Sequence, residues 1–178
     1  MKVVILNFSG RKNGNCSAIS RHIASKFEQT NVFLYDISNN LTSCGNCDYE
    51  CLKPAECCPN ISDFYREVMD TVLSCDLAYF IVPNYCGVPC ANYYAFNERS
   101  VGYFNLDRKK MQAYMSIKKK FVIISNTETE HFVNAMQQQT NDEPDILYLK
   151  TRKYGKQSIA GNILESDAAK ADLDAWLD

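Results

Sequence analysis

Cysteine is the most chemically distinctive residue of this 178-residue chain, which contains nine of them. Five lie close together, as Cys44, Cys47, Cys51, Cys57 and Cys58. A thiolate is both a metal ligand and a redox-active nucleophile. Because a chain of this length can bury a full apolar core without cross-links, the cluster indicates chemistry rather than structural disulfides.

The spacing of the cluster, Cys-x2-Cys-x3-Cys-x5-Cys with a fifth cysteine adjacent, leaves four interpretations open. Four thiolates suit Zn²⁺ or an iron–sulfur cluster, since both form tetrahedral sulfur sites. The ligands would be Cys44, Cys47 and Cys51, with either Cys57 or Cys58 as the fourth. Alternatively, Cys44 and Cys47 could cycle through a disulfide, or the cysteines could simply pack.

A second candidate site is the stretch 7–17, NFSGRKNGNCS, between an apolar run and a stretch with helical spacing. It is rich in small polar residues and positive charge, and it ends at a helix N-terminus, which favours a phosphate. It has neither G-x-x-x-x-G-K-[ST] nor G-x-G-x-x-G, the patterns for nucleoside triphosphates and dinucleotides. The residues predict either a monophosphate site or a solvated turn in which Asn15 caps the helix.

The elements that would position these residues alternate along the chain. Short apolar runs predict buried strands at 2–6, 32–35, 77–82, 121–125 and 146–149. Helical spacing predicts helices at about 15–28, 62–74, 89–101, 128–139 and 167–177. This alternation predicts a single α/β domain over 1–178, with a parallel sheet covered on both faces in a three-layer sandwich. Ligands would bind beyond the carboxyl ends of the strands.

One connection departs from this regular pattern. Residues 37–61 have no convincing periodicity and hold all five clustered cysteines. Loops longer than about 12–15 residues in compact domains are usually functional or disordered. We therefore expect this cysteine-rich loop to have a function of its own.

Charge and composition exclude several classes of partner. The formal net charge is −2, so nucleic acid and anionic membranes are not expected as partners. The N-terminal apolar run, Val3 to Leu6, is too short for a signal peptide or a membrane span, and we expect a cytoplasmic protein. The basic runs 108–110 and 118–120 are typical of a solvated face, although they could attract the 2′-phosphate of NADPH or an acidic partner.

Three segments resemble the NAD(P)H-dependent FMN reductases, and they occur in the same order and with the same spacing as in that family. NFSGRKNGNC resembles the family's NGSPRKNGNT-type phosphate loop, and residues 83–88, PNYCGV, resemble its P-x-Y-x-G segment. Residues 93–100, YYAFNERS, are similar to its L-K-A-F-I-D-R-S helix. The likeness covers about 2–126. It implies a flavodoxin-like fold with five parallel strands in the order 2-1-3-4-5.

The resemblance also implies a function. FMN would carry the chemistry, so that no catalytic side chain is required. NAD(P)H would be the co-substrate, and a nicotinamide or small electron carrier would be the partner. The expected assembly is a homodimer. The implied FMN contacts are Ser9, Arg11, Asn13, Asn15, Cys16, Ser17, Pro83, Asn84, Tyr85, Cys86 and Gly87. The thiols of Cys86 and Cys90 fall near a predicted helix N-terminus, which could stabilise a thiolate.

One branch of this flavin family, the iron–sulfur flavoproteins, has a C-x2-C-x2-C-x4–7-C motif in the same loop. By this resemblance the cysteine-rich loop would hold a [4Fe–4S] cluster that passes electrons between flavin and carrier, although this chain has one more residue between the second and third cysteines.

Departures from the flavin pattern suggest an alternative function. Cys16 replaces the usual Thr or Ser, bulky Phe8 stands in the phosphate loop, and 125–130 replaces a glycine-rich loop with two carboxylates. The alternative is a non-catalytic metal-binding or interaction module on a degenerate flavodoxin-like fold.

Overall fold

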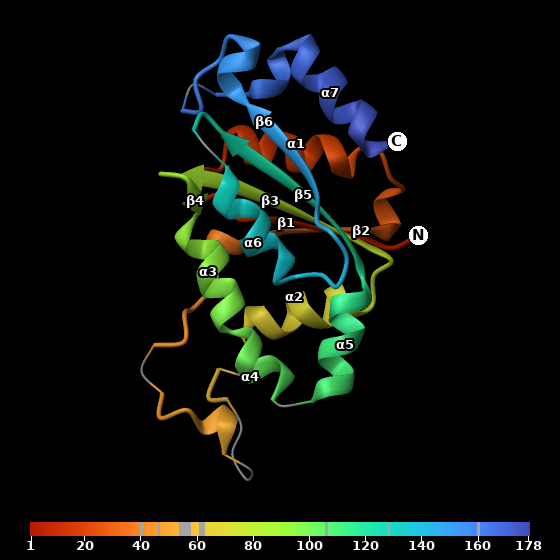
Figure 1. The fold of residues 1–178 in the computed structure, drawn as a ribbon. Helices are drawn as coiled ribbons and strands as arrows, with labels where there is room; N and C mark the ends of the chain where they lie inside the picture. Colours follow the sequence, from red (N-terminus) through yellow and green to blue (C-terminus); the bar gives the residue numbers. More distant parts are fainter. Residues whose placement is uncertain are drawn as a thin grey trace.

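The computed structural model has three layers, with α1 and α7 on one face of the sheet and α2, α3, α5 and α6 on the other (Figure 1). It describes residues 1–39, 41–45, 47–53, 58–60, 63–105, 107–127, 129–159 and 161–178. The strands are β1 (Val3–Asn7), β2 (Val32–Asp36), β3 (Leu77–Tyr85), β4 (Val88–Pro89), β5 (Lys118–Ser125) and β6 (Asp145–Lys150). The α-helices are α1 (Asn15–Ala24), α2 (Phe64–Leu73), α3 (Ala91–Glu98), α4 (Ser100–Phe104), α5 (Arg108–Ser116), α6 (Glu130–Gln137) and α7 (Asp167–Leu177). The predicted three-layer α/β architecture is confirmed.

The sheet has one strand more than the sequence predicts. Its order is β2-β1-β3-β5-β6, with β4 paired to β3 off this path, and the predicted order 2-1-3-4-5 of five strands is corrected accordingly. All pairs are parallel except that of β3 with β4. The missed strand is two residues long, too short to produce a periodic pattern in the sequence.

A tight turn joins β3 to β4. Its two central residues, Cys86 and Gly87, have φ angles of 54° and 86°. Positive φ at both central positions defines the type I′ hairpin turn, which favours glycine because it has no Cβ. The carboxyl end of β3 therefore reverses sharply and presents Asn84 and Tyr85 at the sheet edge.

Two apolar cores account for the strand pattern. Val4 and Leu6 of β1 face α2 and α3, whereas Val3 and Ile5 face α1 and α7, and all four side chains are fully buried. Parallel strands covered on both faces are apolar at every position. This continuity is why short apolar runs located the five parallel strands.

The helices differ from the prediction in two places. The predicted helix over 89–101 is divided at Arg99 into α3 and α4. Helix α5 was missed, because its buried side is small and its first turn is the basic run 108–110. Its N-cap is Asp107, whose carboxylate accepts hydrogen bonds from the backbone N–H groups of Lys109 and Lys110.

The second basic run is not a solvated face, as Lys119 and Lys120 are 4% and 8% exposed. The Lys119 ammonium donates to the carbonyls of Tyr114 and Ile117 at the end of α5, and burial lowers its pKa to about 8. Lys120 Nζ donates to the Trp176 carbonyl at 2.6 Å. These two cations tie helices to β5 and do not form a docking patch.

No helix within the described part of the chain combines the length and the apolar character needed to span a bilayer.

Candidate functional site

A cavity of about 120 Å³ lies at the carboxyl edge of the sheet, where β1 and β3 end side by side. It brings together seven of the predicted FMN contacts: Ser9, Arg11, Asn15, Cys16, Pro83, Asn84 and Tyr85. The described lining does not include the other four: Asn13, Ser17, Cys86 and Gly87. It also contains four residues that the sequence did not predict: Gly14, Ile124, Ser158 and Ile159.

The loop after β1 is folded by its own side chains. Asn7 Oδ1 accepts from the backbone N–H of Ser9 at 3.1 Å, and Ser9 Oγ accepts from the N–H of Arg11 at 3.2 Å. The Ser17 hydroxyl donates to the Arg11 carbonyl at 2.9 Å, so it stabilises the loop and does not line the cavity. Local turns of this kind fix the loop before any ligand binds.

The N-terminus of α1 opens onto this loop. Its N-cap residue is Gly14, and no described side chain accepts from the first N–H groups. These unpaired groups and the helix dipole favour an anion. The exposed guanidinium of Arg11 adds a full positive charge at the same place.

Asn15 does not cap α1, in contrast to the turn that the sequence also allowed. Its Nδ2 donates to the Ser158 carbonyl at 3.0 Å, and its Oδ1 accepts from the N–H of Ile163 at 2.7 Å. Arg11 Nη2 donates to the Ile159 carbonyl at 2.9 Å. The segment after β6 therefore closes one side of the cavity, through contacts 143 and 148 residues apart in sequence that no local pattern could predict.

Cys16 is 3% exposed and lines the cavity as a neutral thiol. Burial raises its pKa to about 12, with a further contribution from Cys90, and this exceeds the opposing effect of the bond to Ser9. Cys16 is therefore a weak hydrogen-bonding group where the resembled family has a hydroxyl.

Phe8 does not crowd the loop after β1. Its ring is fully buried in the core, where it packs edge-on against Tyr93 and Phe96. Its carbonyl accepts from the Cys90 thiol at 3.4 Å and from Asn92 Nδ2 at 3.1 Å. Burial raises the pKa of Cys90, so the helix N-terminus beside it does not produce a thiolate.

The opposite wall of the cavity is the end of β3. Asn84 Nδ2 donates to Thr127 Oγ1 at 2.9 Å and to the Ser125 hydroxyl, while its Oδ1 accepts from the N–H of Gly87 at 2.8 Å. These bonds attach the β3–β4 turn to the loop after β5. The neighbouring Tyr85 side chain is 55% exposed, which leaves its ring free to cover a ligand at the rim.

The described thiols among the predicted metal ligands are not assembled into a metal site. Within the described ranges, no group of three or more His, Cys, Asp or Glu side chains is arranged to hold a metal, and Cys57 lies outside those ranges. Cys44 Sγ donates to the Glu98 carbonyl at 3.9 Å, and Cys47 Sγ donates to the Cys44 carbonyl at 3.8 Å. Burial, followed by the Glu98 carboxylate, raises the pKa of Cys44. All eight described cysteines are free thiols.

Two further thiols of the loop are packed against α4. Cys51 and Cys58 are each 7% exposed and lie against Gly102, where an added Cβ would come within 3.0 Å of Cys58 Sγ. Burial and the neighbouring thiols raise the pKa of Cys51. This packing agrees with the interpretation in which these cysteines serve the structure of the loop.

Arg99, between α3 and α4, anchors the cysteine-rich loop. Its side chain is 2% exposed, and Nη1 donates to the Thr42 carbonyl at 2.7 Å and to Asp63 Oδ2 at 2.6 Å. Nη2 donates to the Asn60 carbonyl at 2.9 Å. One guanidinium thus holds both ends of the loop, a role that the sequence did not reveal.

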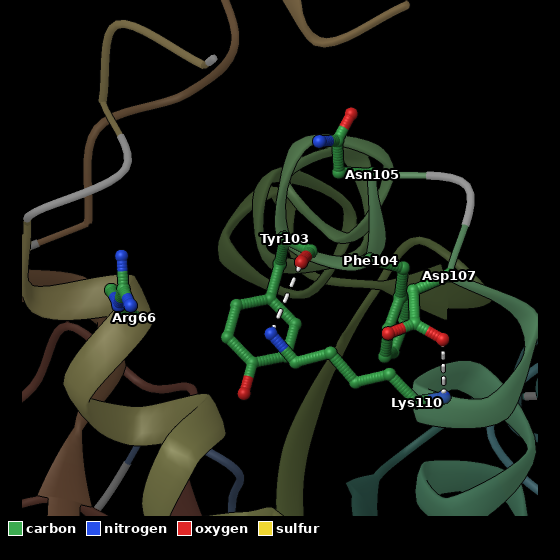
Figure 2. A pocket seen from close by; sticks show the side chains of 6 residues that line it. All are labelled: Arg66, Tyr103, Phe104, Asn105, Asp107 and Lys110. Atoms are coloured by element: carbon green, nitrogen blue, oxygen red, sulfur yellow. Dashed lines mark hydrogen bonds between the residues drawn. The ribbon is translucent and has the colours of Figure 1, made fainter.

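A larger hollow, of about 250 Å³, lies between α2 and the α4–α5 corner (Figure 2). Both cations that line it, Lys110 and Arg66, already have partners. Lys110 Nζ lies 3.5 Å from the centre of the Tyr103 ring and donates to the Tyr103 carbonyl, and Arg66 pairs with Asp70. Its position away from the strand ends also separates it from the place where ligands bind in such sheets.

Comparisons with known proteins find relatives only at the level of structure. No family model matches the sequence. No curated protein matches it either. The fold is similar to that of the Trp repressor binding protein from Bacillus subtilis, with TM-score 0.65, 13% identity, and coverage of 99% of this chain and 98% of that one.

Two other solved structures are also similar. RosB, solved with bound 8-demethyl-8-formylriboflavin-5′-phosphate, has TM-score 0.64 and 12% identity over 99% of this chain and 74% of its own. FerB from Paracoccus denitrificans, a flavoenzyme NAD(P)H:(acceptor) oxidoreductase, has TM-score 0.56 and 12% identity. The match covers 99% of this chain and 95% of FerB. At such low identity the likeness establishes the fold.

Proposed function

We propose that this protein is an FMN-dependent oxidoreductase that uses NAD(P)H or a small electron carrier. The observation that carries the proposal is the cavity at the carboxyl edge of β1 and β3. There the uncapped N-terminus of α1 and the Arg11 guanidinium face Asn84 and Tyr85 at the end of β3. An anion-binding helix terminus at a strand-order reversal is the place where sheets of this type hold nucleotide phosphates.

The residues present fit a flavin phosphate. The N–H groups of the first turn of α1 that follow Gly14, together with Arg11, complement two negative charges, and Tyr85 supplies an exposed aromatic surface beside them. The cavity is smaller than the roughly 300–1,000 Å³ of typical ligand sites. It would therefore enclose the phosphate end, while the ring lies at the open rim against Tyr85.

In this proposal the flavin supplies the hydride or electron transfer. The chain binds and orients it. Arg11 and the helix terminus hold the phosphate, Asn84 fixes the turn that carries Tyr85, and Tyr85 covers one side of the ring. No side chain is required as a proton donor. RosB and FerB support the proposal, because RosB was solved with a flavin phosphate bound and FerB is a flavoenzyme NAD(P)H:(acceptor) oxidoreductase.

Titration of the purified protein with FMN and with riboflavin, followed by flavin fluorescence, tests the proposal. We expect FMN to bind at least tenfold more tightly than riboflavin, because only FMN carries the phosphate. Arg11→Ala should weaken FMN binding by about 10–100-fold, the effect of a lost charge-assisted hydrogen bond, and should leave riboflavin binding unchanged.

Lys12→Ala is the matched control, since Lys12 is an exposed cation of the same loop that does not line the cavity. It should change FMN affinity by less than about threefold, as expected for an exposed charge. Equal FMN affinity in wild type and Arg11→Ala, or no FMN binding at all, would contradict the proposal. Oxidation of NADH or NADPH by the FMN-loaded protein tests the enzymatic step.

One observation favours a second candidate, the non-catalytic module on a degenerate fold. Arg11 and Asn15 already donate to the carbonyls of Ile159 and Ser158, so the chain itself occupies part of the phosphate site. A protein that neither retains nor takes up FMN, with those contacts intact, would have this second function.

A [4Fe–4S] cluster is not part of the proposed mechanism, because no group of described His, Cys, Asp or Glu side chains is arranged to hold a metal and the Cys44 and Cys47 thiols donate to backbone carbonyls. Iron and sulfide analysis of protein purified without oxygen decides the point. We also propose a homodimer, by the resemblance to the FMN reductases, which light scattering of the purified protein would measure.

A further inference from the structure

One short segment forms part of the wall of the strand-end cavity without belonging to a helix or a strand. Residues 157–159, called the strap below, follow the short helical turn Thr151–Tyr154, and Ser158 and Ile159 line the cavity. The Ile159 side chain is 72% exposed. No backbone–backbone hydrogen bond joins the strap to another described residue. Regular secondary structure therefore does not hold the strap in place.

The strap is attached through two side chains at the N-terminal end of α1. Arg11 Nη2 donates to the Ile159 carbonyl at 2.9 Å, and Asn15 Nδ2 donates to the Ser158 carbonyl at 3.0 Å. Among the described residues, 157–159 form no other hydrogen bond or ion pair. The position of the strap therefore depends on two side chains that themselves line the cavity.

The chain on either side of the strap is anchored and contains a glycine with a left-handed backbone. Lys156, just before the strap, pairs with Glu165 beyond it at 2.8 Å. Gly155 and Gly161 have φ angles of 67° and 97°, and a Cβ added at either would meet no atom within 4 Å. The positive φ, and not close packing, accounts for glycine at both positions. The strap is thus a short bridge between two fixed points, with a left-handed residue near each end.

We propose that the strap is a clasp that closes when the cavity holds a phosphate, with Arg11 bridging the phosphate and the Ile159 carbonyl. This inference rests on the phosphate-binding part of the proposed function. A guanidinium has five donor hydrogens in a planar fork. The bond to Ile159 uses one nitrogen of Arg11, so the remaining donors are able to meet a phosphate at the same time.

The two contacts of Arg11 reinforce each other. Its side chain is exposed, and a long exposed side chain loses rotamer freedom when a contact fixes it. Whichever contact forms first takes this loss, so the second forms with less loss of conformational entropy. A bound phosphate therefore orders the strap, and by linkage an ordered strap raises the affinity for phosphate by the same factor. Such couplings change affinity by about 5–150-fold, and we expect about fivefold because solvent weakens the contacts of an exposed side chain.

Backbone ¹⁵N relaxation of the full chain tests the clasp, because it measures the order parameters of residues 157–159 directly. The protein is measured free and with saturating FMN, riboflavin or inorganic phosphate. We expect the order parameters of the strap to rise toward about 0.85, the value of rigid backbone, with FMN and with inorganic phosphate. Riboflavin is the matched ligand, since it has the ring without the phosphate, and it should leave them unchanged.

The outcomes separate the clasp from the flavin function. An equal rise with riboflavin, or no rise with a bound anion, would overturn the clasp while leaving FMN binding intact. A rise with inorganic phosphate in a protein that does not bind FMN would support the clasp and contradict the flavin function. If neither anion binds, both proposals are overturned.

Two variants test the coupling through Arg11. In Arg11→Ala the bridge is absent, so the order parameters of the strap should keep their free values even at saturating FMN. Gly161→Ala places a Cβ on a residue with a φ of 97°, so the strap must shift relative to Arg11, and FMN affinity should fall about fivefold while riboflavin affinity stays the same.

Gly45→Ala is the matched control for the second variant. Its added Cβ would also meet no atom within 4 Å, but the φ of Gly45 is not positive, so FMN affinity should not change. Circular dichroism checks that each variant is folded. Ordering of the strap by FMN in Arg11→Ala, or unchanged FMN affinity in folded Gly161→Ala, would overturn the clasp.

Discussion

Replacement of Arg99 by methionine tests how the cysteine-rich loop is held. The guanidinium makes its hydrogen bonds to Thr42, Asn60 and Asp63 from a side chain that is 2% exposed, and it lies over the ring of Tyr65. Methionine keeps an apolar stem of similar length but no donor. The variant therefore removes the three hydrogen bonds while preserving most of the packing.

The expected loss of stability follows from the burial of the Arg99–Asp63 ion pair. Hydrogen bonds to a charged group contribute about 1.5–3 kcal/mol each, and three that share one guanidinium do not add fully. Removing one partner of a buried ion pair costs about 3–5 kcal/mol. Because Asp63 is itself 27% exposed and can regain water, we expect the free energy of unfolding to fall by about 3 kcal/mol, at the lower end of the range for buried ion pairs.

Urea denaturation followed by circular dichroism measures this loss, and Arg66→Met is the matched control. Arg66 pairs with Asp70 at 3.6 Å, with both side chains more than half exposed, so its removal should cost less than about 1 kcal/mol. In Arg99→Met the buried thiol of Cys58 should also react faster with a disulfide reagent, since its loop has lost its anchor. A loss in Arg99→Met no larger than in the control would refute the reasoning.

Two further predictions concern the turn and the surface. Cys86→Gly should raise the free energy of unfolding by about 0.5–1 kcal/mol in urea denaturation, because Cys86 is exposed and its φ of 54° is strained for a residue with a Cβ; a less stable variant would contradict this. Hydrogen bonds from Lys26 and then His22 lower the pKa of Asp174 to about 2, so the folded chain binds fewer protons than the unfolded chain as the pH falls from about 4 to about 2. The wild type should therefore be more stable than Asp174→Asn above pH 4, and this advantage should shrink as the pH falls through that window. Thermal unfolding at stepped pH measures the difference in stability between the two proteins. A difference that stays constant with pH would contradict the reasoning.

The sequence predicted the elements whose signal depends only on residues close together in the chain. The parallel strands were found because both faces of the sheet are covered, which makes runs such as Val3–Leu6 apolar at every position. The loop after β1 was found because small polar residues before a helix predict a phosphate site whatever the rest of the chain does. Helix α5 was not found, since basic residues occupy its first turn.

The metal prediction depended on spacing, and spacing does not determine where a thiol points. Cys44 lies near Cys47 in sequence and in space, yet each thiol donates to a backbone carbonyl, and Cys51 and Cys58 pack against Gly102. The direction of these side chains is set by α3 and α4, which follow the loop by tens of residues. A ligand set therefore needs the tertiary structure as well as the motif.

Arg11 and Asn15, two polar side chains of the loop after β1, are not equivalent, although the sequence resemblance gives both as FMN contacts. Asn15 uses its oxygen for Ile163 and one amide hydrogen for Ser158, so its bonds mainly fix the segment after β6. Arg11 has five donor hydrogens, and its bond to the Ile159 carbonyl engages a single nitrogen, Nη2. Arg11 can thus meet a phosphate without releasing Ile159. The affinity for an anion should therefore depend on Arg11 and the helix terminus, while Asn15 positions the segment after β6.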